Sequence, residues 1–174
     1  MSGNRLRFSI VLFALSFAAS LPAQQPFTLD QILGAPYLNE LAASKTGHRL
    51  IWSENLRGRR NVWAAEGPAF AARQLTNYNQ DDGGELSELQ FTSDGGAIVY
   101  VRGEGKNSAG EYPNPTSNPS GAEEDIWLIS WSGGTPRKID AGDTVRISAQ
   151  GRIAYAKNNQ VWLAPPACLR IHQD

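Results

Sequence analysis

The chain offers few side chains of the kinds and spacings that catalysis needs. A nucleophilic serine of the Gly-x-Ser-x-Gly type sits between two glycines on a strand-to-helix turn, and no serine of the sequence has both glycines. Ser108 comes nearest, with Gly110 after it but Lys106 in place of the first glycine. The two histidines are His48, in an expected turn, and His172, close to the last residue. We therefore predict that the chain has no catalytic residues of its own.

Two other polar clusters have simple structural interpretations. The segment Gly103-Glu104-Gly105-Lys106 lacks the glycine spacing and the following helix of a phosphate-binding loop, so we expect a polar loop there. The carboxylates of Asp81, Asp82, Glu85 and Glu88 fall short of the dense ligand register of a calcium loop, which favours a solvated turn. The sequence thus predicts neither a metal site nor a cofactor site.

Three arginines and a tyrosine are the side chains that suggest a functional surface. Arg57, Arg59 and Arg60 lie in a short connection between two apolar segments, and Tyr112 lies in a long connection from 102 to 124. Long connections within compact domains are usually functional or disordered. Whether these four residues form one surface depends on the elements that carry them, and a disordered loop is the alternative.

Those elements belong to an internal repeat. A tight turn, an apolar segment, a connection and a second apolar segment occur three times. Repetition at this period is typical of stacked or radial arrays. Each unit has a tryptophan at the same place in its second segment, Trp63, Trp127 and Trp162, which favours core packing over ligand stacking. The three pairs of segments are 44–52 with 61–65, 93–100 with 125–129, and 148–155 with 160–164.

The apolar runs predict the architecture. Residues 97–101 and 126–129 are apolar at successive positions, as in a sheet covered on both faces, rather than at alternate positions. Small antiparallel sheets buried on both sides are the blades of a β-propeller. We predict an all-β fold, a partial β-propeller of about three four-stranded blades. A single β-sandwich would require the repeats to be accidental. The expected blades are 37–78, 79–140 with its long loop, and an incomplete third at 141–166.

In such a stack, equivalent connections emerge on one face. Arg57, Arg59, Arg60 and Tyr112 should therefore lie together on that face. The open ends of an incomplete stack expose apolar surface and unpaired strand edges, so self-association is expected as well.

The two ends of the chain differ from the repeats. Residues 1–23 resemble an export leader, because Arg5 and Arg7 precede an apolar run that is too short to span a bilayer. Cleavage is expected after Ala23 or after Ser20, and an uncleaved membrane anchor is the alternative. Either way we expect export to the periplasm or the medium. Residues 24–36 should form a lead and a short helix that lies as a strap on the sheets, opened by a capping box of Thr28 and Gln31.

The last residues, 167–174, do not continue the repeat, and we interpret the chain as the front part of a longer protein that is cut short or misread. Its formal charge is −1, with 16 basic and 17 acidic side chains. This balance gives no electrostatic footprint for nucleic acid. The one cysteine, Cys168, allows neither an intrachain disulfide nor a cysteine metal site.

Across nearly the whole chain after the leader, the sequence resembles the amino-terminal propeller of the prolyl oligopeptidase family of serine peptidases, and in particular exported bacterial members that resemble dipeptidyl aminopeptidases and acylaminoacyl peptidases. Single-blade motifs of this kind are shared with TolB-like propellers, whereas the ordered series is more specific. The segments that carry the resemblance are 27–33, 60–63, 72–76, 91–95, 112–117, 133–138 and 160–165.

The resemblance implies a function for the missing part. Members of this family join the propeller to an α/β-hydrolase domain that cleaves peptides with a Ser-His-Asp triad. The propeller filters the substrates. By this resemblance, the face with Arg57, Arg59, Arg60 and Tyr112 would dock that domain or line substrate access. Glu123 and Glu124 are similar to a glutamate pair that binds the substrate amino terminus, although here the pair abuts a strand. The alternative is a TolB-like periplasmic propeller that binds protein partners.

Overall fold

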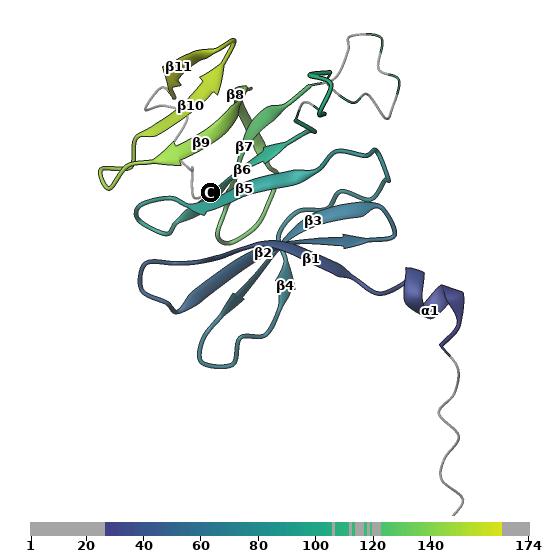
Figure 1. Ribbon diagram of the computed structural model, residues 1–174. Coiled ribbons are helices and arrows are strands. Elements are labelled where there is room, and N and C mark those ends of the chain that lie inside the picture. The colour runs from purple at the N-terminus through teal and green to yellow at the C-terminus, as the bar shows by residue number, and fades with distance from the viewer. Residues whose placement is uncertain are drawn as a thin grey trace, which may run out of the picture.

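The computed structural model describes residues 27–105, 107–111, 113, 117, 119 and 123–164, and these residues form three antiparallel sheets in a row (Figure 1). This arrangement confirms the predicted all-β, partial-propeller fold. We number the sheets in chain order. Sheet 1 contains β1 (Tyr37–Ala43), β2 (Arg49–Leu56), β3 (Arg59–Glu66) and β4 (Arg73–Gln74). Sheet 2 contains β5 (Leu86–Phe91), β6 (Ala97–Arg102), β7 (Asp125–Ser130) and β8 (Arg137–Ala141). Sheet 3 contains β9 (Asp143–Ile147), β10 (Ile153–Lys157) and β11 (Gln160–Leu163).

The sheets share one local plan. In each, strands that are consecutive in the sequence are neighbours in the sheet, so every connection is a hairpin. The turn before the second strand contains a glycine with positive φ, at Gly47, Gly95 and Gly151. Only glycine adopts that backbone conformation at no steric cost, which is why the sequence keeps it there in all three units.

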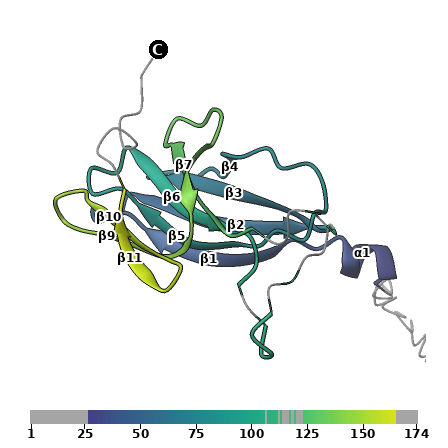
Figure 2. The ribbon, with the colours of Figure 1, turned by 90° about the horizontal axis from the view of Figure 1, so that it is seen from above.

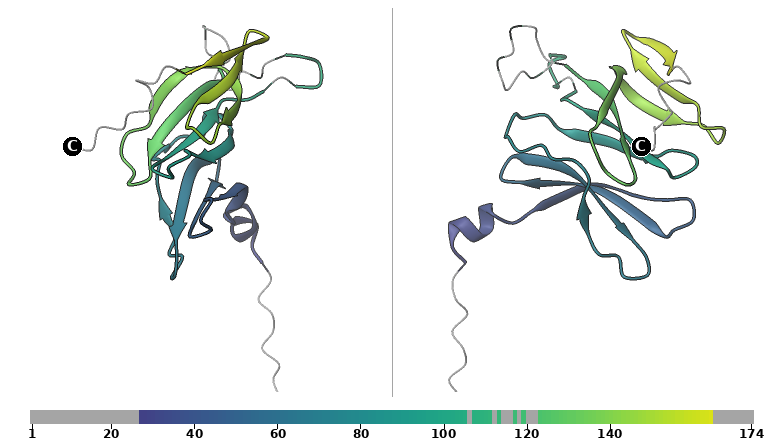
Figure 3. Two further views of the ribbon diagram at one scale, coloured as in Figure 1. Left: turned by 90° about the vertical axis from the view of Figure 1, so that its left-hand side faces the viewer. Right: turned by 180° about the vertical axis from the view of Figure 1, so that it is seen from behind.

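Sheet 2 lies between the other two and is covered on both faces (Figures 1 and 3). Along β6, Ile98 and Tyr100 belong to the core shared with sheet 1, whereas Val99 and Val101 belong to the core shared with sheet 3. Side chains alternate between the two faces of a strand. A strand that is buried on both sides therefore needs apolar residues at successive positions. Each of these fully buried side chains contributes about 1.5–3 kcal/mol.

The short helix α1 (Leu29–Leu33) precedes sheet 1. Its capping box is formed by Thr28 and Gln31, with the backbone N–H of Gln31 donating to Thr28 Oγ1 at 3.2 Å and that of Thr28 donating to Gln31 Oε1 at 2.9 Å. The expectation that the helix lies on the sheets as a strap is wrong. It lies beyond the end of β1 and none of its residues is buried (Figure 2). Three residues separate it from β1, which is too short a connection to fold it back over a sheet face.

Within the part of the chain that the structure describes, no helix is long and apolar enough to cross a membrane.

Candidate functional site

The β2–β3, β6–β7 and β10–β11 connections lie at one end of the sheets. The segment between β4 and β5, which leads from sheet 1 to sheet 2, contacts both the β2–β3 and the β6–β7 connection. The carboxylate of Asp81 lies against Gly58 of the β2–β3 connection. The carbonyl of Glu85 accepts a hydrogen bond from Gly103 N, at the start of the β6–β7 connection, at 3.0 Å. Gly58 has a φ of 80°, and a Cβ placed on it would lie 2.1 Å from Asp81 Cγ, so this approach requires glycine. The residues of the β6–β7 and β10–β11 connections line a common pocket.

The predicted surface residues are separated at this end. Arg60 points between sheets 1 and 2, where its Nη2 lies 2.8 Å from Glu85 Oε1 and its Nη1 lies 3.6 Å from Asp81 Oδ1. Arg59 is the preceding residue of β3, so its side chain lies on the opposite face of sheet 1. There it lines a small pocket of about 150 Å³ beside Trp63.

Arg57 occupies the β2–β3 turn itself, with a φ of 53°, and its side chain is exposed. Among the described residues no ion pair involves Arg57 or Arg59, so these two remain candidates for contact with a partner, whereas Arg60 is neutralised. Tyr112 lies outside the described residues.

The acidic residues around Asp81 are paired with arginines rather than arranged around an ion. Asp82 forms an ion pair with Arg102, and Glu88 Oε2 lies 2.8 Å from Arg146 Nη1. No group of three or more potential metal ligands occurs among the described residues. These carboxylates therefore connect neighbouring strands and sheets.

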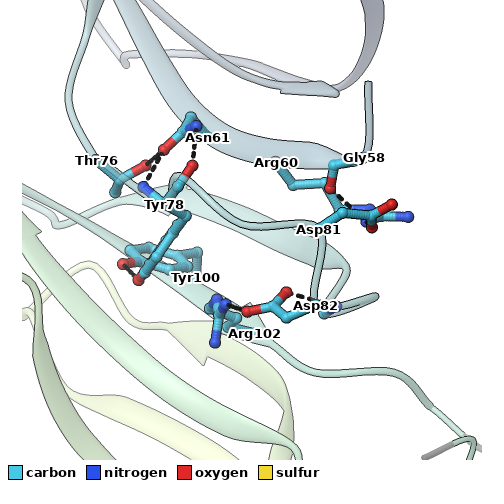
Figure 4. A network of polar contacts seen from close by, with 10 residues as sticks. Gly58, Arg60, Asn61, Thr76, Tyr78, Asp81, Asp82, Tyr100 and Arg102 are labelled. Carbon is cyan, nitrogen blue, oxygen red and sulfur yellow. Dashed lines mark hydrogen bonds and ion pairs between the residues drawn. The ribbon is translucent and has the colours of Figure 1, made fainter. Parts of the chain in front are cut away.

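A polar network next to Arg60 fixes the chain where it leaves sheet 1 (Figure 4). Asn61 Oδ1 accepts hydrogen bonds from Thr76 Oγ1 at 2.9 Å and from Tyr78 N at 2.7 Å, and Asn61 Nδ2 donates to Tyr78 O at 2.9 Å. Thr76 Oγ1 in turn accepts from Val62 N at 2.9 Å. Asn61 and Thr76 are both buried. The network thus holds residues 76–78 against β3 where β4 has already ended.

Tyr78 and Arg102 extend this network into sheet 2. The hydroxyl of Tyr78 shares a hydrogen bond of 2.7 Å with that of Tyr100, and the Arg102 guanidinium lies 4.2 Å from the centre of the Tyr78 ring. Burial raises the pKa of Tyr78 and that of Tyr100. Both phenols therefore stay protonated at neutral pH and supply no base. These contacts hold sheets 1 and 2 together and have a structural role.

The pocket between sheets 2 and 3 is larger, at about 570 Å³, and carries charge of both signs. Burial, followed by the nearby Asp143 carboxylate, raises the pKa of Glu124 to about 7. Asp125 Oδ2 lies 2.7 Å from Lys138 Nζ, while its Oδ1 accepts no hydrogen bond from any described residue. Glu124 can thus hold or release a proton near neutral pH. Sequence reasoning singled out Glu124 only by resemblance and missed Asp143, which comes from the next sheet and has no local signal.

The other residues considered from the sequence lie apart from these clusters. His48 is exposed in the β1–β2 turn at the other end of sheet 1, and Ser108 is exposed in a turn of the long β6–β7 connection. Trp127 packs against the core between sheets 1 and 2, as expected, and Trp63 is partly buried. Trp162 is 45% exposed, so the prediction of core packing is wrong for it in this chain. Among the described residues no fourth strand lies beside β11, whereas β8 lies beside the strand that carries Trp127. Cys168, His172 and the leader lie outside the described residues.

Comparisons with known proteins give solved structures alone, since no protein-family model and no curated protein sequence matches the chain. TolB from Acinetobacter baumannii is similar over 72% of this chain and 28% of its own length, with 15% identity and a TM-score of 0.48. Hydrazine synthase from Kuenenia stuttgartiensis is similar over 66% and 35%, with 15% identity and a TM-score of 0.46. An acylaminoacyl peptidase in complex with Z-Gly-Gly-Phe-chloromethyl ketone is similar over 72% and 24%, with 9% identity and a TM-score of 0.46. The chain thus spans 24 to 35% of these structures, and none of their activities is carried over from the likeness.

Proposed function

We propose that this chain is the propeller portion of an exported serine peptidase of the prolyl-oligopeptidase type, in which it controls peptide access to a separate α/β-hydrolase domain. The observation that carries the proposal is the stack of three similar sheets with sheet 2 covered on both faces, which is the packing of propeller blades. The ordered series of resembling segments supports the family.

The chemistry of the described residues supports a role without catalysis. The strongest polar cluster, around Asn61 and Tyr78, is satisfied by its own hydrogen bonds. Among the described residues that line the pocket at Glu124 there is neither a serine nor a cysteine. In our proposal, the groups that cleave the peptide bond come from another domain.

The end that carries Arg57 and the β6–β7 connection is the side we assign to that domain. Arg57 is an exposed cation on a turn, and the long connection leaves sheet 2 at the same end. Exposed loops held on a rigid scaffold are where binding residues concentrate. A hydrolase domain seated there would admit only peptides that pass the loops.

The experiment compares this chain with the product of the gene extended beyond codon 174. We expect the extended product to hydrolyse dipeptidyl and aminoacyl p-nitroanilides and to react with a fluorophosphonate, and this chain to do neither. Deleting residues 107–123 from the extended product should raise hydrolysis of a folded protein substrate relative to that of the small substrates.

An extension without a hydrolase domain would overturn the proposal, and so would unchanged size selectivity after the deletion. In the first case, a chain that binds a defined envelope protein through the Arg57 end would instead fit a TolB-like binding propeller.

A further inference from the structure

A shared backbone feature, one residue with positive φ in the first strand of each sheet, shows which residues of the three sheets are equivalent. The first strand of each sheet contains one non-glycine residue with a φ between 51° and 56°, followed directly by an apolar residue. In the first strands of sheets 1 and 2 it lies at a shift of register. The three pairs are Glu40 with Leu41, Glu88 with Leu89, and Thr144 with Val145.

This correspondence defines a backward face on each sheet, the face turned toward the preceding sheet. Leu89 in sheet 2 and Val145 in sheet 3 are buried on that face. Their counterpart in sheet 1, Leu41, is 72% exposed. Leu38 is 57% exposed, although Leu86 at the same place in sheet 2 is buried. Sheet 1 therefore carries the apolar residues of a backward face, and none of the described sheets packs against them.

The forward face of each sheet is the face turned toward the following sheet. Its apolar residues are buried in sheets 1 and 2 and exposed in sheet 3. Val62 in sheet 1 and Ile126 in sheet 2 are buried in the cores that those sheets share with their followers. The counterpart in sheet 3 is Val161, which is 81% exposed, and its neighbour Leu163 is 60% exposed. Sheet 3 therefore carries a forward face that no sheet of residues 27–164 covers.

The two free faces form the same kind of pair as the faces that pack together within the chain. In both internal contacts a forward face packs on a backward face: β5 lies against β1, β2 and β3, and β9 lies against β5, β6 and β7. The free forward face of sheet 3 and the free backward face of sheet 1 are the next such pair. They lie on opposite sides of sheet 2, so one chain cannot bring them together (Figure 1).

We propose that a second copy of this chain completes the array, with the forward face of sheet 3 in each copy packed on the backward face of sheet 1 in the other. Each copy carries one face of each kind, so the contact is self-complementary, and two such contacts close a ring. Six sheets lie within the usual four to eight of closed propellers. A contact between different faces closes when the rotation permits and otherwise forms filaments. This inference does not depend on the proposed function.

Cysteine pairing tests the contact directly. In a Cys168→Ser background of the full chain, Leu41→Cys and Val161→Cys chains are purified separately, mixed and oxidised. Because β11 should lie against β1 of the other copy, we expect a mixed disulfide dimer at least tenfold more abundant than either dimer of identical chains. Lys45→Cys, in the exposed β1–β2 turn, is the control partner and should not pair with Val161→Cys. Pairing of identical chains in preference to the mixed pair would overturn the proposal.

The mass in solution gives the second measurement. Light scattering should show twice the mass of one chain at micromolar concentration. Val161→Glu should weaken the dimer at least tenfold, while Gln160→Glu, exposed on the other face of the same strand, should leave it unchanged. A monomer, filaments or aggregates of mixed size would contradict the ring. Hydrolysis assays decide the proposed function separately, so the failure of one leaves the other standing.

Discussion

The hydroxyl groups of Tyr78 and Tyr100 lie 2.7 Å apart, which joins the segment leaving sheet 1 to the buried centre of sheet 2. Tyr100 is fully buried in β6, and Tyr78 is partly exposed and lies under the Arg102 guanidinium. The hydrogen bond is one of several direct polar links between sheets 1 and 2, beside those from Arg49 to the Gly95 carbonyl and from Arg73 to the Trp131 carbonyl. It therefore tests whether polar groups or apolar packing set the stability of the stack.

Replacing Tyr100 by Phe should lower the free energy of unfolding by about 1 kcal/mol, since it removes one hydrogen bond without creating a large cavity. The further change Tyr78→Phe should then cost little, because its partner is already gone. Urea unfolding of the two single variants and the double variant measures this coupling, with Tyr37→Phe at an exposed site as control. Strictly additive losses would show that the two hydroxyl groups act independently.

Asn61 makes a larger contribution, because its side chain satisfies several buried groups at once. Asn61→Ala leaves the Thr76 hydroxyl and the Tyr78 N–H without their acceptor. Each unsatisfied buried group costs about 1–3 kcal/mol, so we expect a loss of at least about 2 kcal/mol in urea unfolding. Asn77→Ala, exposed in the same segment, should stay within about 0.5 kcal/mol of the parent. A similar effect for both variants would mean that the network is not structural.

The opposite end of sheets 1 and 2 is joined through Trp131. The guanidinium carbons of Arg49 and Arg73 lie 4.4 and 4.6 Å from the centre of its ring, and the ring of Phe91 lies 5.8 Å away. Trp131→Ala should cost about 2 kcal/mol, less than the 3–5 kcal/mol of a fully buried aromatic. Trp131→Phe keeps an aromatic face for both cations and should lose less than half of that. Equal losses in thermal unfolding would assign the effect to the indole alone.

The sequence predicted the sheets well because their signals are local. Continuous apolar runs, repeated glycines and a common tryptophan position lie within single strands and turns, so each can be recognised without knowing its neighbours. The position of α1 could not be predicted, because a capping box defines where a helix starts and says nothing of what it packs against. The sequence placed Arg59 and Arg60 in the same connection, but the direction of each side chain depends on strand alternation, which turns successive residues to opposite faces of sheet 1.

The contacts between sheets had no such signal. Tyr78 contacts Tyr100, and Glu124 contacts Asp143, only when two sheets pack together. The local sequence around each of these residues does not indicate its partner. The partners of the acidic residues near Asp82 were equally hard to predict from the sequence. Their spacing did not indicate which arginines they contact, because Arg60 and Arg102 lie on separate strands. Pairing across units is decided by the stacking geometry, which a single sequence does not display.

Glu124 should make stability depend on pH in a defined window. Its pKa is raised from an ordinary value of 4.5 to about 7, first by burial and then by Asp143 and Glu88. The folded state therefore binds this proton more tightly than the unfolded state, so the contribution to stability is complete below about pH 4.5 and is lost as pH rises through 7. Because Glu124 is only half-buried, we discount the shift for solvent screening and expect a loss of about 1–2 kcal/mol.

Glu124→Gln isolates that effect, because an amide cannot ionise. The variant should match the parent at pH 4 and exceed it by about 1–2 kcal/mol at pH 8 in urea unfolding. Glu123→Gln, exposed at the preceding residue, should keep the parental pH profile. Asp140 affects stability in a different pH range. Hydrogen bonds from Lys157 and Tyr155 lower its pKa to about 2, so its contribution to the free energy of unfolding is lost only as pH falls below 3.8. If Glu124→Gln retained the parental slope between pH 4.5 and 7, the slope would belong to another group and the Glu124–Asp143 contact would not hold a proton.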